Sequence, residues 1–399
     1  MRGLRGLIVD FKFNEAEQQF RDEMRALLAE QLPGDYADRA FVEDVPEDER
    51  AALAVKMTKA LADRKWLAMA WPEEHGGIGA GHVQQMLYKE EVAYNSMPSG
   101  STMGVDWVGP AIMLFGTDEQ KAKYLPNIVG GVDQWCTLYS EPGAGSDLAS
   151  LQTRAVRDGD EWVINGSKIW TSGGHTSNMG WLAARTDPDA PKHRGISTFV
   201  MDMDSPGIEV RPLVNMAGEH SFNEVFFEDV RIPGENLVGV ENRGWYQVAT
   251  ALDYERSGVG AYAGGKRNLE RLVGVAKEDD SLLSNNPTAR YELADRWVEL
   301  QVGYNVAYRI PFLQAQGRIP NHEASVSKLY GSELTQRIAR TGLHLLGMQG
   351  QVMPGSPHSK LGGAIAKTYL TSVSSTVAAG TSEVQRNIIA QRGLGLPRG

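Results

Sequence analysis

Hydrophobic residues recur at helical spacing through the first third of the chain. In residues 14–32 the apolar side chains of Phe20, Met24 and Leu27 fall on one face of a helix, and a Pro-Gly pair ends the pattern. The same spacing predicts further helices at residues 47–66, 82–95 and 118–129. We therefore expect a helical N-terminal region.

The pattern changes in the middle of the chain to short runs with strand character. Residues 161–164 and 167–170 flank an Asn-Gly pair, which favours a two-residue hairpin turn because both residue types tolerate positive φ. Further strand-like runs occupy residues 196–201, 208–213 and 224–227. These runs predict a β domain.

Helical spacing returns after Gly244. The runs cover residues 244–277, 288–318, 322–347, 358–378 and 382–391. Long helices in succession favour an antiparallel bundle. Pro311 would end or kink the second of these helices unless the helix tolerates it there, and residues 277–287 predict a mobile loop. The predicted class is α+β and mostly helical, with an N-terminal α-helical domain at 1–130, a middle β-barrel or sandwich domain at 131–240 and a C-terminal four-helix bundle at 241–399.

Composition narrows the possible partners and location. The chain has 399 residues, 42% of them hydrophobic, and its 40 basic and 50 acidic residues give a net charge of −10. This balance argues against nucleic-acid binding, which needs clustered positive charge. Cys136 is the single cysteine, so no internal disulfide can form and a cytoplasmic location is expected. The most apolar run, 107–115, is too short to span a membrane, so no membrane insertion is expected.

Two motif matches do not predict sites. The Gly-x-Gly-x-x-Ala string at 258–263 lies inside a helical run, whereas a dinucleotide site needs a preceding strand. The eight histidines show no metal-ligand spacing, so no metal site is expected.

Two segments together indicate a planar, polar ligand. Residues 139–147 read Tyr-Ser-Glu-Pro-Gly-Ala-Gly-Ser-Asp, a turn that offers hydroxyls and a backbone free to approach a ligand closely. Residues 168–172 read Lys-Ile-Trp-Thr-Ser, an aromatic face next to two hydroxyls. Their combination favours a flavin site.

Both segments resemble the acyl-CoA dehydrogenase superfamily, and the resemblance covers nearly the whole chain. It implies FAD as cofactor, an acyl-CoA substrate, an electron-transfer flavoprotein or similar acceptor, and a dimer or tetramer with identical or different subunits. The implied cofactor-binding residues are Tyr139, Ser140, Gly145, Ser146, Trp170, Thr171, Ser172, Gly347, Thr381 and Glu383.

The family removes a proton beside the thioester with a carboxylate base. Many members carry this base near the C-terminus, where the present chain has Ala379. Other branches carry it on the first helix of the C-terminal bundle, and there Glu255 matches in the string Leu-Asp-Tyr-Glu-Arg. The resemblance therefore implies Glu255 as catalytic base and Ser146, Asp253 and Arg256 on the substrate side. Structural pairing of Glu255 with Arg256 is the alternative for a helical Glu-Arg pair.

Part of the family pattern is missing. Many relatives have an Arg-x-x-Phe-Gly string that reaches the flavin pyrophosphate of a neighbouring subunit, and none occurs between residues 266 and 296. Hetero-oligomeric members from steroid side-chain degradation resemble the chain in this respect. Substitutes could come from Arg267, Arg271 or Arg290, although such residues usually serve as exposed helix charges.

The function expected from the sequence is α,β-dehydrogenation of a branched or bulky acyl-CoA. The small residues Ala378 and Ala379 suggest room for a large acyl group. Two alternatives remain open: a non-catalytic subunit that completes the cofactor site of a hetero-oligomer, and a flavin-dependent monooxygenase of the same fold.

Overall fold

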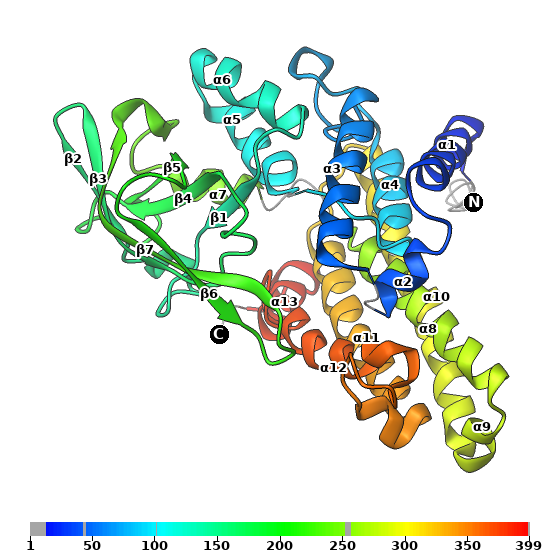
Figure 1. Cartoon of the computed structure of the whole chain (residues 1–399). Coiled ribbons are helices and arrows are strands. Elements are labelled where there is room, and N and C mark those ends of the chain that lie inside the picture. The colour runs from blue at the N-terminus through cyan, green and yellow to red at the C-terminus, as the bar shows by residue number, and fades with distance from the viewer. Residues whose placement is uncertain (1–12, 43–44, 101, 252–256, 398–399) are drawn as a thin grey trace.

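The sheet lies on one side of the molecule and most helices on the other, while some helices lie beside the sheet (Figure 1). The computed structural model describes residues 13–42, 45–100, 102–251 and 257–397. The predicted α+β, mostly helical class is confirmed.

The N-terminal helices form where the sequence pattern places them, and two short helices add to the prediction. They are α1 (Glu15–Gln31), α2 (Tyr36–Phe41), α3 (Glu47–Asp63), α4 (His82–Tyr94), α5 (Gly109–Phe115) and α6 (Asp118–Val129). Asn14 caps α1 in a capping box with Glu17, which satisfies amides left free at the first turn. The apolar face of α1 packs on α3 through buried Met24, Met57 and Leu61.

The described strands form one sheet in the order β6-β7-β3-β2-β4-β5-β8, with β1 paired to β4. Their bounds are β1 (Trp135–Leu138), β2 (Arg154–Asp158), β3 (Glu161–Lys168), β4 (Met179–Arg185), β5 (Ile196–Asp202), β6 (Ile208–Val214), β7 (His220–Pro233) and β8 (Leu237–Val238). Both faces of β4 and β5 are covered. Leu182 and Phe199 point into a core shared with β3 and β7, whereas Trp181 and Val200 pack with residues of α5 and α6.

The predicted hairpin turn at Asn165-Gly166 is wrong. Strand β3 runs through this pair, and Gly166, with φ of +144°, sits in an irregularity of the pairing with β7. A Cβ on Gly166 would come within 2.7 Å of the Thr153 backbone, so the close approach requires glycine there. The turn lies instead between β2 and β3, at Gly159 with φ of +63°.

The C-terminal helices are α7 (Gly244–Ala251), α8 (Val259–Glu278), α9 (Ser281–Asn285), α10 (Pro287–Ala315), α11 (His322–Leu346), α12 (Ala364–Ser375) and α13 (Ser382–Ile388). The structure decides two points here, of which the sequence left the first open and predicted the second wrongly. Pro311 lies inside α10 without ending it, because the helix is held by buried neighbours such as Ala307 and Ile310. The predicted mobile loop contains α9, whose Leu282 and Leu283 pack against the core.

The Gly-x-Gly-x-x-Ala string begins α8 and serves helix packing. Gly258 is the N-cap, with φ of +65°. Tyr262, in the first turn, is completely buried and donates a 2.8 Å hydrogen bond to the Ser327 carbonyl of α11. A Cβ on Gly303 of α10 would lie 2.1 Å from the Tyr262 ring, so glycine lets the helices approach closely. The helical setting of the string is the one that the sequence pattern predicts.

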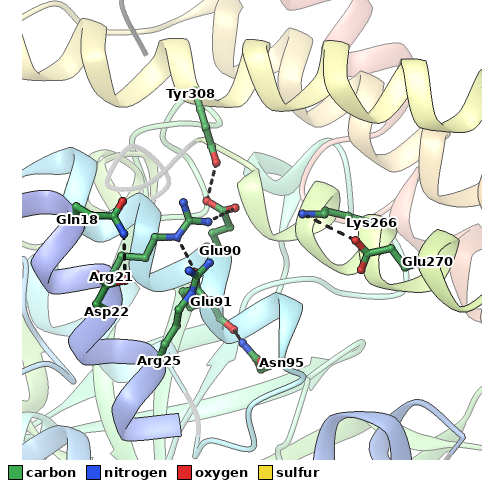
Figure 2. Close-up of polar contacts among 10 residues, drawn as sticks. All are labelled: Gln18, Arg21, Asp22, Arg25, Glu90, Glu91, Asn95, Lys266, Glu270 and Tyr308. Carbon is green, nitrogen blue, oxygen red and sulfur yellow. Dashed lines mark hydrogen bonds and ion pairs between the residues drawn. The ribbon is translucent and has the colours of Figure 1, made fainter. Parts of the chain in front are cut away.

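A partly buried polar network joins α1, α4 and α10 (Figure 2). Arg21 of α1 contacts Glu90 at 2.9 Å and Glu91 at 2.8 Å, and Arg25 also contacts Glu91 at 2.8 Å. From α10, the hydroxyl of Tyr308 donates a 2.8 Å hydrogen bond to Glu90. Because the carboxylates are almost completely buried, these partners fix how the N-terminal helices pack on the C-terminal bundle.

Candidate functional site

The loop at residues 139–147 leaves the end of β1 and closes on itself. Glu141 and Ala144 exchange two backbone hydrogen bonds of 3.0 Å, and the residues between them form an exposed tip. Gly145 and Ser146 are also exposed. A Cβ on Gly145 would have no atom within 4 Å, so a need for glycine there would have to come from a bound molecule rather than from the chain.

A buried ion pair holds the backbone of this loop in place. The ammonium of Lys168, which is fully buried, lies 2.8 Å from Glu141 and donates a 2.9 Å hydrogen bond to the Tyr139 carbonyl. The Glu141 carboxylate also accepts hydrogen bonds from the amides of Gln152 and Thr153, at 2.5 and 2.8 Å.

Burial and charge act in opposite directions on this pair. Burial lowers the pKa of Lys168 to about 8, although the Glu141 carboxylate opposes that change. Burial alone would raise the pKa of Glu141, but the Lys168 ammonium and the two backbone amides outweigh it and hold this pKa below its usual range.

The loop and the Trp170 segment meet directly, as the sequence predicts. The amide of Ile169 donates a 2.9 Å hydrogen bond to the Ser140 carbonyl. The next residue, Trp170, has φ of +63°, which is uncommon for a bulky residue, and its side chain is 57% exposed. Its ring contacts Phe222 edge-on at 5.8 Å between centroids. This backbone therefore presents a broad aromatic surface beside the loop.

The hydroxyls after Trp170 differ in their surroundings. Ser172 is exposed, whereas Thr171 is buried and its Oγ1 atom has no hydrogen-bond partner among the described residues. Buried hydroxyls are rarely left unpaired, so this atom is suited to a partner from outside the chain. An unpaired hydroxyl, an exposed indole and an open glycine turn fit a flavin.

The C-terminal candidates form a second group. Thr381 caps α13 and accepts a 3.2 Å hydrogen bond from an amide in its first turn, while Glu383 in that turn is exposed. The backbone amide of Glu383 and the Thr381 side chain hold the pKa of Glu383 below its usual range. Lys328 of α11 donates a 2.6 Å hydrogen bond to the Gly380 carbonyl and so fixes the turn before α13. Gly347 ends α11 with φ of +56° and is exposed.

The two groups are not linked directly. Across residues 13–42, 45–100, 102–251 and 257–397, no hydrogen bond or ion pair joins Gly347, Thr381 or Glu383 to the 139–147 loop or to Trp170. The C-terminal bundle does contact the β domain, where Lys367 of α12 lies 2.8 Å from Glu219.

The predicted base and its neighbours, Glu255, Asp253 and Arg256, lie outside the described residues. Immediately after them, the carbonyl of Ser257 accepts a 2.6 Å hydrogen bond from the Ser327 hydroxyl of α11. The start of α8 is thus anchored one residue beyond this string.

The candidate replacement arginines are engaged elsewhere. Arg267 and Arg271 lie 2.7 and 2.9 Å from Asp38 of the short helix α2, and Arg271 stacks over the Phe41 ring. Their side chains are mostly buried, so the expectation of exposed charges is wrong for both. Arg290 is exposed.

The Lys168–Glu141 pair was not predicted, although the sequence carries a signal for it. In β3, Trp162 and Ile164 are buried, and an alternation of two places Lys168 on the same face. A lysine on a buried face needs a charged partner. The sequence pattern does not reveal that this partner lies in the 139–147 loop.

A groove lies between α3 and α6. It has a volume of about 1300 Å³, and Ala54 and Val55 of α3 face Leu125 and Val129 of α6 across it. None of the predicted site residues lines it.

The described ranges contain neither a membrane-spanning helix nor a metal cluster. None of their helices is both long and apolar enough to cross a membrane. No group of three or more His, Cys, Asp or Glu residues in them is arranged to hold a metal ion.

Comparisons with known proteins agree along nearly the whole chain. Family models for the N-terminal, middle and C-terminal domains of acyl-CoA dehydrogenases match residues 14–132, 136–230 and 242–394. The chain is similar to acyl-CoA dehydrogenase IpdE1 of Mycobacterium tuberculosis, with 34% identity over 96% of this chain and 98% of that protein.

Solved structures give the same result. A Tcur3481-Tcur3483 steroid ACAD matches with a TM-score of 0.87 and 36% identity over 98% of this chain and 100% of that chain. The ChsE4-ChsE5 complex from Mycobacterium tuberculosis matches with a TM-score of 0.86 and 32% identity over the same shares. The chain therefore belongs to the acyl-CoA dehydrogenase family.

Proposed function

We propose that this acyl-CoA dehydrogenase uses FAD to introduce a double bond between the α and β carbons of an acyl-CoA thioester, with Glu255 as the base. The observation that supports the cofactor assignment is the junction of two motifs at the Ile169–Ser140 hydrogen bond, next to the unpaired Thr171 hydroxyl. The match to all three family domains supports the reaction.

Each proposed role follows from side-chain chemistry. The Glu255 carboxylate takes the proton from the α carbon, and the electron pair of that C–H bond becomes the new double bond. The electron pair of the β C–H bond leaves with the hydride, which bound FAD would accept. Trp170, Thr171 and the 139–147 loop would hold the flavin. Ser146 at the exposed end of that loop would contact the substrate, together with Asp253 and Arg256.

The substrate is proposed to carry a bulky or branched acyl group. Ala378 and Ala379 are small and exposed, and Ala379 stands where many relatives place a glutamate. Two of the similar structures, both of the Tcur3481-Tcur3483 protein, are named as steroid ACADs, which makes a polycyclic acyl group the first to test. A cytoplasmic location and domain boundaries near residues 130 and 240 stay predictions.

The test of the base is dye-linked oxidation of short, branched and steroid-type acyl-CoA thioesters by the wild type and by Glu255→Gln. Loss of a general base lowers the rate by at least about a hundredfold. The control is Glu278→Gln at the exposed end of α8, which should keep wild-type turnover. Equal turnover by Glu255→Gln and the wild type would remove Glu255 from the base role.

The second candidate is a subunit that works only with a different chain. Its support is that Arg267 and Arg271 are held by Asp38, while Gly347 and Thr381 lack direct links to the loop in the described chain. A second chain could then complete the cofactor site. One of the similar solved structures is a complex of two proteins, ChsE4 and ChsE5.

Native mass and flavin absorbance of the purified chain separate these two candidates. A colourless protein that becomes yellow and active only with a second chain supports the hetero-oligomer. A yellow protein that oxidises acyl-CoA by itself contradicts it. Reduction of an electron-transfer flavoprotein by the active species tests the proposed acceptor.

A further inference from the structure

The turn that carries Trp170 and Thr171 is held by strand β7 through one buried side chain. Thr171 and Asn223 exchange two backbone hydrogen bonds of 3.1 Å. The Asn223 side chain is completely buried, and its Nδ2 atom donates a 3.0 Å hydrogen bond to the Thr171 carbonyl. Gly174 packs against this contact, because a Cβ at this position would lie 3.0 Å from the Thr171 side chain. These contacts hold the turn after Trp170, whose φ of +63° costs free energy.

Two histidines complete the surroundings of this amide. The Asn223 Nδ2 atom lies 3.1 Å from Nδ1 of His175, and its Oδ1 atom lies 2.8 Å from Nε2 of His220. The two imidazole rings stack with centroids 3.9 Å apart. His175 follows the turn and His220 begins β7, so the pair closes the turn against the sheet.

The hydrogen-bond partners fix the protonation pattern. A backbone carbonyl only accepts, so the Asn223 atom facing Thr171 must be the amide nitrogen rather than the oxygen. That nitrogen is a donor, and Nδ1 of His175 must therefore accept, which requires a neutral ring with its proton on Nε2. His220 must donate from Nε2 to the Asn223 oxygen, which it can do in either charge state. Protonation of His175 would place two donors against each other.

The charges near the pair are few. His175 is exposed, but the partial desolvation of its ring, and then the neighbouring His220, lower the pKa of His175 below the ordinary 6.5, while its hydrogen bond with Asn223 and the Glu47 carboxylate at the start of α3 oppose this. Glu219, next to His220, is engaged by Lys367 of α12 at 2.8 Å, and Arg50 of α3 also acts on it. Because the folded chain takes up this proton less readily than the unfolded chain, the contribution of His175 to stability is lost as pH falls below 6.5.

We propose that Asn223, His175 and His220 are positioning residues for the flavin side of the active site: together with the backbone pairing of Thr171 and Asn223, they hold Thr171 most firmly while His175 is neutral. This inference rests on the proposed function for its meaning in catalysis, but the contact itself is a property of the chain. In acid, loss of the His175 acceptor frees the Asn223 amide, and the turn that presents Trp170 and Thr171 loosens.

Hydrogen exchange of the full-length protein tests the contact without requiring flavin. The peptide covering residues 168–176 is followed at about pH 7.5 and about pH 5.0, on either side of the ordinary histidine pKa, with correction for the intrinsic exchange rate. Wild-type protection should fall about tenfold at the lower pH, the scale of one buried hydrogen bond. His175→Phe, which keeps a ring but cannot accept, should be equally weakly protected at both pH values.

His175→Gln is the conservative variant, because its side-chain oxygen can accept from Asn223 but does not titrate in this range. It should keep wild-type protection at the higher pH and retain it at the lower pH. His358→Phe, on an exposed loop, should behave like the wild type. The proposal would be overturned if protection fell about tenfold at the lower pH in His175→Gln as it does in the wild type. It would also be overturned if wild-type protection did not fall.

Flavin retention through gel filtration at the two pH values connects the contact to the cofactor. The wild type should lose FAD at the lower pH about tenfold faster than His175→Gln does. If no species binds FAD at either pH, the proposal that this chain uses FAD by itself fails, while the exchange result still decides the contact. If FAD release is the same in both proteins although protection differs, the contact is structural only and the positioning role is wrong.

Discussion

The ion pair under the 139–147 loop and the network between α1, α4 and α10 both bury carboxylates, but they differ in how many charges share the site. Among the described residues Glu141 has one ion-pair partner, Lys168, while Arg185 acts on it only through charge, and two backbone amides donate to its carboxylate. In the network, Glu91 is contacted by both Arg21 and Arg25. When Lys168 is lost, no other cation contacts Glu141 directly and only the Arg185 charge remains, whereas Glu91 keeps a direct arginine contact when one of its two is lost.

The two sites also hold different parts of the molecule. The Lys168–Glu141 pair fixes the backbone of a loop proposed to contact the cofactor, since Lys168 also binds the Tyr139 carbonyl. The arginine network fixes the packing of helices. We therefore expect damage to the first site to affect flavin retention as well as stability, and damage to the second to affect stability alone.

The largest effect is expected from Lys168→Met. It leaves the buried Glu141 carboxylate without its counter-charge, which costs about 3–5 kcal/mol of unfolding free energy. Urea denaturation measures this loss, and flavin absorbance should fall with it. The double variant Lys168→Met/Glu141→Gln should recover at least half of the loss, because the remaining group is neutral. A loss below about 1 kcal/mol in the single variant would mean that the pair contributes little.

Arg21→Met should have the next largest effect, about 2 kcal/mol, because Arg25 still contacts Glu91 and Tyr308 still donates to Glu90. The matched variant is Arg25→Met, whose side chain is 52% exposed and should cost less than about 1 kcal/mol. Both are measured by urea denaturation, with flavin content unchanged per folded molecule. Equal losses of unfolding free energy in the two variants would contradict the expectation that Arg21 contributes more than Arg25 to the network.

Tyr308→Phe should cost about 1 kcal/mol, the scale of one hydrogen bond to a carboxylate that keeps its arginine. Thermal unfolding against Tyr291→Phe, an exposed tyrosine of the same helix, measures this difference. A loss as large as that of Arg21→Met would show that the hydroxyl, rather than the arginine, holds Glu90.

The smallest effect is expected in the acid dependence of stability. Because the pKa of Glu141 in the folded chain lies below its usual 4.5, the unfolded chain binds this proton first, and the stability from the ion pair is lost as pH falls below that value. Glu141→Gln should be less stable at neutral pH and should lose less on acidification. Unfolding free energies between about pH 7 and about pH 3 test this, and parallel curves for the two proteins would be the contrary result.

Local pattern predicted much of the helical framework. The capping box at Asn14 and the apolar spacing after it define α1 by interactions within one helix. The bounds of α1 therefore depend little on the elements that pack against it. The same holds for α4 and α6, whose bounds agree with the predicted runs within one residue. The loop and Trp170 motifs were also visible in the chain as strings of residue types.

Contacts between distant segments changed the other predictions. Asn165-Gly166 has the composition of a turn, but β7 pairs with β3 on the side away from β2 and keeps the strand continuous. Pro311 stays within α10 because buried packing outweighs one lost hydrogen bond. Neither outcome follows from the local residue types.

The sequence by itself determined the helical pattern, the family and the two motifs of the proposed flavin site. Only the tertiary structure decided that Lys168 supports the loop and that Asn223, His175 and His220 enclose the Thr171 turn. The physical reason is that burial and charge pairing are set by segments far apart in the chain, which β-sheet pairing brings together.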